Sequence, residues 1–350
     1  MADTYRRDPT GPLRVGFAYN QRPAMADGGA DERYAEWDDA STIDAIVAAL
    51  SLAGEVIRLE ATPDFPAHLR EASPDIVFNM AEGLVGANRE GHVPAICEFL
   101  GIPYTGSDPT TLGLCLDKGR TKEILGVYGV PTPVFTVVRP GESTPVLPEP
   151  PAIVKPIAEG SGRGITQSSY CESPTAIVAA VERVLRVYEQ PAIVEQWLPG
   201  REFTCAVVGN RPAMRVLPIV EIDFSVLPTG ALPLYSFEAK WVWDTAETPL
   251  SVHRCPAPMP ADLQRRVEGV ALAACRALGV RDWGRVDVRC DAAGAPHVIE
   301  VNPIPGIIPG EASGSCYTAS ARAAGMSYDE MVLSVLRAAA DRCGLTLKGR

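Results

Sequence analysis

The chain has 350 residues, enough for two or three domains, and its 46% hydrophobic and 21% charged content is ordinary for a folded globular protein. Its net charge of −11 excludes nucleic acid as an expected partner, because phosphate backbones bind basic surfaces, and leaves room for a small anionic ligand where positive charge is local. No apolar run approaches the roughly 18–20 residues that cross a bilayer, the polar N-terminus lacks a signal core, and nine cysteines without a Cys-x-x-Cys pair predict reduced thiols in a cytoplasmic protein.

The N-terminal third predicts alternating strands and helices after a disordered leader over residues 1–12. The expected strands are 13–20, 55–60 and 75–79, and the expected helices are 41–50, capped by a Ser or Thr, and 66–72. This alternation predicts a parallel sheet in which the loops after the strands face a ligand.

The rest of the chain predicts two further units. The expected helices are 93–100, 117–128, 173–188 and 328–342, and the expected strands include a short one within 102–108, then 152–155 and 192–197. We expect an N-terminal α/β domain over 13–115, a small central domain with a glycine-rich loop over 116–199, and a larger α+β domain over 200–350 that carries a metal site.

Two short apolar runs near the end of the chain carry oxygen ligands. Side chains repeat every two residues along a strand, so Glu300 and Asn302 share a face, and Asp287 lies beside them if the two runs pair. Arg285 adds a cation on the face of Asp287. Two carboxylates and an amide are hard oxygen ligands suited to Mg²⁺ held together with nucleotide phosphates.

A lysine and a glycine-rich loop come earlier in the chain. Lys155 ends an expected strand and is followed by Glu159 and by glycines at 160, 162 and 164. Glycines let backbone N–H groups approach phosphate oxygens. Alone, the loop is more often a plain hairpin, and it is neither a Walker loop nor a Rossmann fingerprint. The strand and carboxylates over 194–202 could hold an adenine and a ribose, or form a solvated acidic loop.

The order of these motifs is more specific than any one of them. The charged and amide residues follow as Lys118, Lys155, Glu195, Glu202, Arg285, Asp287, Glu300 and Asn302. Together with segments 101–106, 117–118, 155–161, 283–287, 300–306 and 324–328, they resemble the ATP-grasp superfamily, and specifically the D-alanine–D-alanine ligase family, of which the chain looks like a divergent member. The resemblance spans about residues 13–342. It implies a three-domain ATP-grasp fold, α/β and α+β, with an N-terminal Rossmann-like parallel sheet domain, and it implies a homodimer.

The resemblance also implies a role for each matching residue. The residues expected to bind ATP are Lys118 and Lys155 on the phosphates, Glu195, Trp197 and Leu198 along the adenine, Glu202 on the ribose, and Glu159 and Lys240. Asp287, Glu300 and Asn302 would bind two Mg²⁺, or Mn²⁺. Arg285 would neutralise an acyl-phosphate and a tetrahedral oxyanion, and Ser161 would lie near the first substrate.

The chemistry that this resemblance implies fits these residue types. Joining a carboxylate to an amine in water needs an activated acyl group, which ATP supplies by phosphorylating the carboxylate. In phosphoryl transfer the protein mainly positions the reacting groups and neutralises the charge on the phosphates. The acyl-phosphate must be kept from water, so we expect a lid at 159–164 or at 235–241.

Four departures from the family concern the amino-acid pockets. Glu36 is the nearest counterpart of the glutamate that orients the first amine. The family's His-Gly-x-x-Gly-Glu-Asp-Gly becomes a segment that starts at Asn79 and runs through Glu82-Gly83 to Arg89-Glu90-Gly91. Trp241 replaces a loop tyrosine and cannot accept a hydrogen bond.

The fourth departure follows Gly306, where the segment is longer than in the family. The serine that holds the second substrate is either Ser313 or Ser315. Because hydrogen-bonded pockets discriminate strongly, such changes alter substrate choice without altering the reaction.

We therefore expect an ADP-forming, ATP-dependent carboxylate–amine ligase that makes a peptide bond between amino acids or small molecules other than two D-alanines. One alternative is a genuine D-alanine–D-alanine ligase of cell-wall synthesis. Others are a non-catalytic ATP-binding protein and a kinase that releases its acyl-phosphate. A Ser-His-Asp hydrolase is disfavoured, because Ser161 has no partner histidine in its sequence context.

Overall fold

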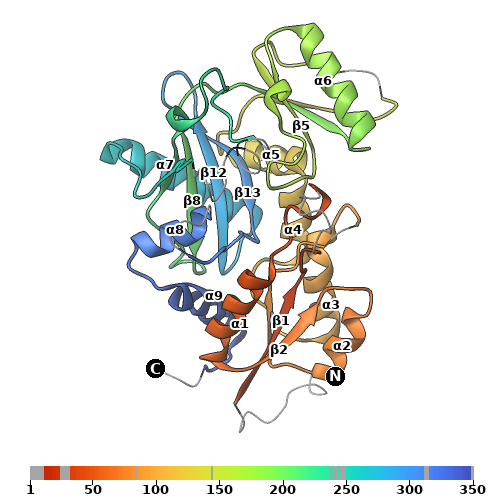
Figure 1. Cartoon of the computed structure of the whole chain (residues 1–350), viewed down its shortest axis with the longest axis vertical. Helices are drawn as coiled ribbons and strands as arrows, with labels where there is room; N and C mark the ends of the chain where they lie inside the picture. The colour runs from red at the N-terminus through yellow and green to blue at the C-terminus, as the bar shows by residue number, and fades with distance from the viewer. Residues whose placement is uncertain are drawn as a thin grey trace.

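The structure, a computed structural model, describes residues 12–23, 32–83, 85–142, 145–236, 239, 243, 250–310 and 315–347. Three β-sheets follow one another along the long axis of the molecule (Figure 1). A sheet from the N-terminal segment lies at one end, a small sheet from the middle of the chain at the other, and the C-terminal sheet between them (Figure 1).

The N-terminal sheet is parallel. Its strands are β1 (Leu13–Tyr19), β2 (Gly54–Glu60) and β3 (Ile76–Asn79), and the helices beside it are α1 (Ala40–Ser51), α2 (Phe65–Ala72) and α3 (His92–Leu100). The strand order is β2-β1-β3, and β3 is buried along its whole length, as in parallel sheets that are covered on both faces. The predicted alternation of strands and helices is confirmed.

Two local predictions in this sheet were wrong. Helix α1 begins on Asp39, whose carboxylate accepts the Thr42 N–H at 2.8 Å, instead of on a Ser or Thr. The strand expected within 102–108 is a single bridge between Val77 and Tyr104.

The second sheet is small and antiparallel. Its strands are β4 (Phe135–Val138), β5 (Ala152–Pro156), β6 (Tyr170–Cys171) and β7 (Ala192–Gln196), in the order β4-β7-β5-β6. Helix α6 (Pro174–Val187) packs Ile177 and Val184 into the same core as this sheet. Helices α4 (Pro109–Leu116) and α5 (Lys118–Val127) lead into it.

The sequence analysis does not predict α4. Its Thr-Thr-Leu-Gly run lacks clear helical periodicity, although Asp108 caps the helix and Pro109 opens it. The domain boundary near 115 falls at the end of this helix and the boundary near 199 falls between two strands, and both boundaries stay a prediction.

The third sheet carries most of the C-terminal half. Its strands are β8 (Glu202–Val208), β9 (Arg215–Val216), β10 (Val220–Ile222), β11 (His253–Arg254), β12 (Trp283–Cys290) and β13 (Pro296–Asn302). The order is β11-β10-β8-β12-β13, with β9 on β8. The helices are α7 (Ala261–Leu278), α8 (Cys316–Ala323) and α9 (Tyr328–Cys343), and 3₁₀ turns occur at Glu32–Tyr34, Arg89–Gly91, Gln167–Ser169 and Phe224–Val226.

The N-terminal sheet and the C-terminal helices share one hydrophobic core. Phe17 and Ile46 belong to the same buried cluster as Leu336 of α9. Trp283, the first residue of β12, packs on Phe78 of β3 with ring centroids 5.9 Å apart. The N-terminal core therefore anchors the strand that carries Arg285 and Asp287.

Asp282 ties three parts of the chain together just before β12. Its buried carboxylate pairs with Arg342 of α9 (2.7 Å between Oδ2 and Nη2) and accepts the Gly106 N–H at 2.8 Å. Its φ of +62° is one that Asn tolerates. We expect Asp282→Asn to lower the free energy of unfolding by about 2 kcal/mol, because the charge on the carboxylate that Arg342 binds is lost. Chemical denaturation measures this, and an equal loss in the exposed Asp341→Asn control would contradict it.

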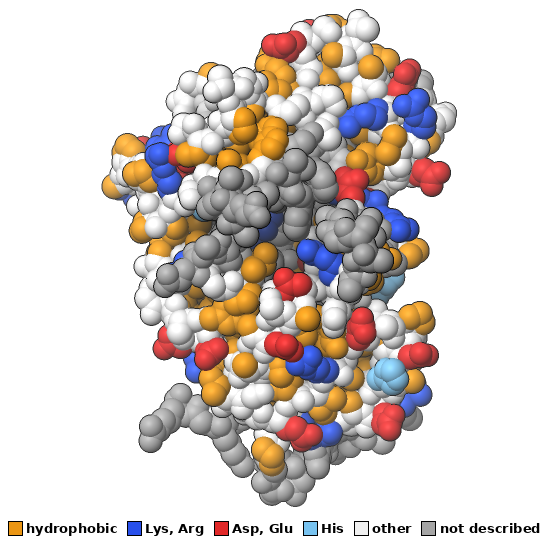
Figure 2. Space-filling model, viewed as in Figure 1, with side chains coloured by type: hydrophobic (Ala, Val, Ile, Leu, Met, Phe, Trp, Pro, Cys, Tyr) orange, Lys and Arg blue, Asp and Glu red, His pale blue; other side chains and the backbone are white. Residues whose placement is uncertain are grey.

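The surface also bears on possible partners. Within the described ranges, every helix is too short or too polar to span a bilayer. Among the described residues on the face in Figure 2, acidic and basic side chains are interspersed instead of gathered by sign. That face therefore offers nucleic acid no continuous basic surface.

Candidate active site

The two closing strands bring the predicted metal ligands and the predicted arginine together. Strands β12 and β13 pair antiparallel, with Asp287 opposite Glu300 and Arg285 opposite Asn302, so the condition for Asp287 to lie beside the other two ligands is met. Arg285 Nη2 lies 3.0 Å from Asp287 Oδ2 and 3.7 Å from Glu300 Oε1. The Asn302 amide lies 3.4 Å from an oxygen of each acid. Thr204 of β8 donates to Asp287 at 2.9 Å.

The electrostatics of this cluster suit a divalent cation. Burial raises the pKa of Asp287 and the charge of Glu300 raises it further, against the lowering effect of Arg285. Both carboxylates thus gain from added positive charge. Two carboxylates and an amide oxygen are the hard donors that Mg²⁺ takes beside phosphates, so Asp287, Glu300 and Asn302 fit that ion.

Lys118 reaches the same cluster from another element. It is the first residue of α5, whose start is capped by Asp117. Its Nζ donates to the Glu159 carbonyl at 2.6 Å and lies 3.5 Å from Glu300 Oε2. One buried lysine therefore links the glycine-rich loop to the carboxylates of the closing strands.

Lys155 and Glu195 form a buried group with a third residue, Lys122. Lys155 Nζ lies 2.7 Å from Glu195 Oε2, and Lys122 Nζ lies 3.3 Å from Oε1. Burial lowers the pKa of Lys122 to about 8. Burial alone would raise the pKa of Glu195, but the charges of Lys122 and Lys155 lower it below its usual value. The sequence analysis misses Lys122, although it lies four residues after Lys118, on the same helix face.

Arg289 is a second residue that the sequence analysis misses. It lies opposite Glu202 between β12 and β8, with Nη1 2.8 Å from Glu202 Oε2. Its Nε donates to the Leu198 carbonyl at 2.6 Å, and its guanidinium lies 4.2 Å over the Trp197 ring. One arginine thus joins three residues expected along the adenine and ribose. Strand alternation is the available signal, since Arg285 and Arg289 share a face.

The glycine-rich loop is held at both ends. The Glu159 carboxylate accepts hydrogen bonds from Arg163, at 2.9 Å, and from Gln190. Ser161 has a φ of +51°, in the left-handed region that favours glycine. A non-glycine residue held there is a feature of ligand-binding loops and switch regions.

The same loop lies directly on Glu36. A Cβ atom added to Gly160 would come within 2.0 Å of Glu36 Oε1, so only glycine fits there without moving the carboxylate. Arg89 fixes the other oxygen, with Nη2 2.8 Å from Glu36 Oε2, and donates to the Ala158 carbonyl at 3.0 Å.

Glu36 belongs to a set of carboxylates that we call the three-glutamate cluster, formed with Glu82 and Glu90. Each residue offers an oxygen within 4.8 Å of the other two. Burial raises the pKa of Glu82 well above its usual range and that of Glu90 to about 8, and the neighbouring carboxylates add to both shifts. The sequence analysis notes Glu82 and Glu90 as departures from the family but not as neighbours of Glu36.

The remaining predicted substrate residues are placed as follows. Asn79 is 2% exposed, and its side-chain oxygen accepts the Ala81 N–H at 3.2 Å, so its amide shapes the turn before Glu82. Ser315 Oγ donates to the Gly306 carbonyl at 2.6 Å and caps α8. The predicted substrate residues Ser315 and Gly306 are therefore neighbours. Lys240, Trp241 and Ser313 lie outside the described residues.

The three-glutamate cluster predicts a pH dependence of stability. With a folded pKa of about 8 against the usual 4.5, Glu90 keeps a proton in the folded protein that the unfolded chain releases over this window. The contribution of Glu90 to stability therefore falls as pH rises from 4.5 to 8. We expect the free energy of unfolding of Glu90→Gln to be about 1–3 kcal/mol higher than that of the wild type near pH 8. Near pH 5 the two proteins should be almost equally stable.

Chemical denaturation at the two pH values measures this difference. The matched control is Glu71→Gln, an exposed substitution on α2 that should behave alike at both pH values. A Glu90→Gln effect of the same size at both values would contradict the prediction.

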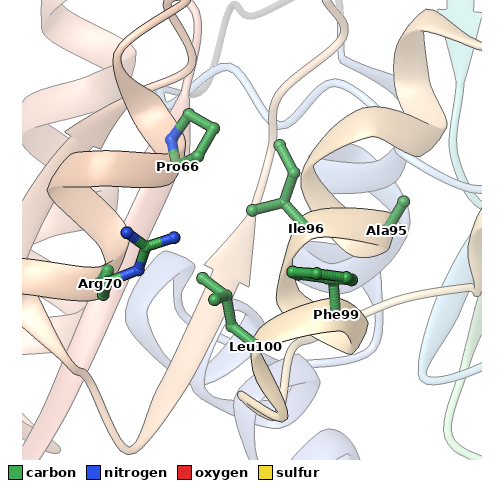
Figure 3. Close-up of a pocket in the computed structure, with 6 residues that line it drawn as sticks. All are labelled: Pro66, Arg70, Ala95, Ile96, Phe99 and Leu100. Carbon is green, nitrogen blue, oxygen red and sulfur yellow. The ribbon is translucent and has the colours of Figure 1, made fainter.

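A separate surface pocket lies between α2 and α3 (Figure 3). It is lined by Pro66, Arg70, Ala95, Ile96, Phe99 and Leu100, and Figure 3 shows the Arg70 guanidinium as its charged group. None of the predicted site residues lines it. The pocket offers apolar contact surface and no carboxylate, so the candidate active site remains the one around Arg285 and Lys118.

This chain has relatives among known sequences and solved structures. A family model described as D-ala D-ala ligase C-terminus matches residues 147–337. The uncharacterized protein y4sG of Sinorhizobium fredii is 36% identical over 310 residues, which cover 86% of this chain and 88% of that protein. The D-alanine–D-alanine ligase of Bordetella avium is 34% identical over 271 residues, 77% of this chain and 79% of that one.

The fold has a counterpart of known structure. The D-alanine–D-alanine ligase of Bacillus anthracis, solved in complex with ATP, matches with a TM-score of 0.69 at 23% identity, over 94% of this chain and 99% of that one. This likeness confirms the predicted fold class.

Proposed function

The chain belongs to the D-alanine–D-alanine ligase family of ADP-forming ATP-grasp ligases, and from this membership we propose what it joins. It phosphorylates the carboxylate of a first substrate with ATP and joins the acyl group to the amine of a second. The two substrates are amino acids or related small molecules, and the pair is not two D-alanines.

The observation that carries the proposal is the convergence of charge at the closing strands. Lys118 and Arg285 lie 3.0–3.7 Å from the carboxylates of Asp287 and Glu300, and these groups come from α5, β12 and β13. In our proposal Asp287, Glu300 and Asn302 would hold magnesium, which would supply positive charge to neutralise the nucleotide phosphates. Lys118 and Lys155 bind the phosphates themselves, as phosphoryl transfer requires.

The reaction proceeds in two steps. A carboxylate oxygen of the first substrate attacks the γ-phosphorus of ATP, and the bond to the β-phosphate oxygen breaks to release ADP. The second substrate's amine then attacks the acyl carbon, loses a proton, and inorganic phosphate leaves. Arg285 neutralises the charge on the acyl-phosphate and on the tetrahedral oxyanion. The loop 159–164, next to Lys118, serves to keep water from the acyl-phosphate.

A different substrate pair is supported by the first-substrate side of the site. Glu82 stands where the family has a histidine, and Arg89 with Glu90 stands where it has Glu-Asp. Arg89 and Glu82 both lie at Glu36, the counterpart of the amine-binding glutamate. Charge in a buried pocket discriminates between substrates strongly.

The alternative is D-alanine–D-alanine ligation itself. It is favoured by relatives such as the Bordetella avium protein, which is named a D-alanine–D-alanine ligase. The relative from Sinorhizobium fredii, which shares more of its length with this chain, is uncharacterized.

ADP release separates these possibilities. It is measured with Mg²⁺ and ATP against a panel of D- and L-amino acids, singly and in pairs, with mass detection of products. A joined product from a mixed pair supports the proposal, and turnover with D-alanine alone restores the alternative. ADP without a joined product indicates a kinase, and no ADP with any pair while ATP binds indicates a non-catalytic ATP-binding protein.

The protein is further proposed to act as a homodimer through the outer surface of α3. Phe99 is 87% exposed there, beside Ala95 and Ile96, and exposed apolar clusters of this kind mark contact surfaces. We expect Phe99→Glu to convert the dimer to a monomer in sedimentation equilibrium. A monomeric wild type, or an unchanged mass in the variant, would contradict this assignment.

A further inference from the structure

We propose that the three-glutamate cluster binds the positive groups of a dicationic first substrate, an amino acid that carries a second amine or a guanidine besides its α-ammonium. The inference rests on the proposed function, because it names the substrate class of the same site.

The three-glutamate cluster contains more carboxylates than cations. Glu36, Glu82 and Glu90 bring three carboxylates within 4.8 Å of one another, and the cation that pairs with them is Arg89. The Arg89 guanidinium bonds Glu36 and the Ala158 carbonyl. When all three carboxylates are ionised, as a cationic ligand would favour, the Arg89 guanidinium balances one of them and two negative charges are left for the ligand to match. Without a ligand, burial and mutual repulsion keep protons on Glu82 and Glu90.

A second, independent observation is that the Glu90 carboxylate is buried without a partner. It is 8% exposed, and the described residues give the side chains of Glu82 and Glu90 no hydrogen bond and no ion pair. Buried carboxylates are ordinarily paired or hydrogen-bonded. An unpartnered carboxylate that is nine-tenths buried and faces two others points to a cationic ligand.

The position of the cluster fits a substrate whose carboxylate is to be phosphorylated. Glu36 lies against the backbone of Gly160, and Arg89 is bonded to Ala158, one residue before Glu159. The Glu159 carbonyl in turn binds Lys118. A substrate held by its positive groups at the cluster can therefore extend its carboxylate toward Lys118 and the closing strands.

The backbone around the cluster is fixed before any ligand binds. The Gly83 carbonyl accepts the Trp37 Nε1–H at 3.0 Å, and the Gly83 N–H donates to Asn20 Oδ1 at 2.9 Å. A Cβ atom at Gly83 would lie 2.6 Å from the Arg89 carbonyl oxygen, so the two segments that carry Glu82 and Glu90 touch. Such preorganisation reduces the entropy lost on binding.

A dication fits the cluster better than the other cations. A single ammonium would leave one buried carboxylate unmatched. A divalent metal ion would compete with Arg89, whose Nη2 already occupies Glu36 Oε2 at 2.8 Å. A diamino acid or a guanidino acid supplies two separate positive groups, each a hydrogen-bond donor, and matches both the charge and the number of acceptors.

The test compares first substrates that carry a second amine with analogues of the same chain length that lack it. ADP release by the full chain with Mg²⁺ and ATP is measured for ornithine and lysine against norvaline and norleucine, in both configurations, with the amine panel described above. We expect kcat/KM to be at least about 10-fold higher for the diamino acids. Glu82→Gln and Glu90→Gln should each remove about 10-fold or more of that preference, whereas the exposed Glu71→Gln should change neither the preference nor the rate with norvaline and norleucine.

Binding gives a readout that does not depend on turnover. Calorimetry in the presence of ADP should detect ornithine, and both glutamine variants should weaken its binding at least about 10-fold. Equal kcat/KM for norvaline and ornithine, with no effect of either glutamine variant, would overturn the inference. Continued ADP formation in that case would leave the proposed function standing. Absence of ornithine binding would overturn it even if no donor reacted. Loss of one bound Mn²⁺ in either variant, without diamine binding, would also overturn it and assign a metal site.

Discussion

We expect Arg285→Met to lower kcat for ligation by about 10³-fold or more and to leave the Kd for ATP within a few-fold of the wild-type value. The guanidinium lies 3.0 Å from Asp287 and 3.7 Å from Glu300, where the charge on an acyl-phosphate would develop in our proposal. It therefore acts mainly in the transition state, where each lost electrostatic contact appears in kcat. Single-turnover ADP formation together with equilibrium ATP binding separates the two quantities.

Two further variants make this result interpretable. Arg285→Lys keeps a positive charge but loses the planar fork, so it should recover only part of the lost rate. Arg266→Met removes an exposed arginine on α7 and should leave kcat unchanged. If the Kd for ATP rose while kcat stayed unchanged, Arg285 would instead contribute equally to binding of ATP and of the transition state, and its proposed role would be wrong.

The closing strands are the part of the site that the sequence predicts best. Strand alternation is a local property, so the shared face of Glu300 and Asn302 can be read from adjacent residues. The observed register, with Asp287 opposite Glu300, follows once the two runs pair. The same alternation places Arg289 on the face of Arg285. Its partner Glu202, however, is 87 residues away in sequence, and the spacing of residues does not predict that contact.

The first-substrate side could not be predicted in this way. Glu36 and Arg89 are 53 residues apart, and the loop glycine that touches Glu36 is Gly160. These contacts depend on how the N-terminal sheet meets the small central sheet, which is set by tertiary packing. Resemblance to the family locates Glu36, but it cannot place Glu82 and Glu90 beside it, because these positions depart from the family pattern.

Helix α4 illustrates a different limit. Its start follows ordinary rules, with Asp108 as the cap and Pro109 in the first turn. Its sequence lacks a clear apolar stripe because both sides of the helix are in use: Leu112 lies in one hydrophobic core and Cys115 in another. A helix buried between two cores loses the periodicity that would predict it.

We expect Glu195→Gln to lower the free energy of unfolding by about 3–5 kcal/mol, because two buried ammonium groups then face a neutral amide. Lys155 lies 2.7 Å from this carboxylate and Lys122 3.3 Å, and both lysines are buried. Lys122→Met should lower it by less, about 1–2 kcal/mol, since it leaves the pair of Lys155 and Glu195 intact and removes the hydrogen bonds of Lys122 and its longer ion pair, at 3.3 Å. Chemical denaturation of the two variants measures both values.

The combination of the two substitutions distinguishes a structural role for Glu195 from a role on the adenine. If the carboxylate serves the lysines, adding Lys122→Met to Glu195→Gln removes one unmatched charge and recovers part of the lost stability. If the carboxylate instead serves the nucleotide, as the family resemblance implies, Glu195→Gln weakens ATP binding at nearly unchanged stability, and Lys122→Met recovers nothing. Both oxygens of Glu195 face lysines, so we expect the first result, with the backbone of this strand left to contact the adenine.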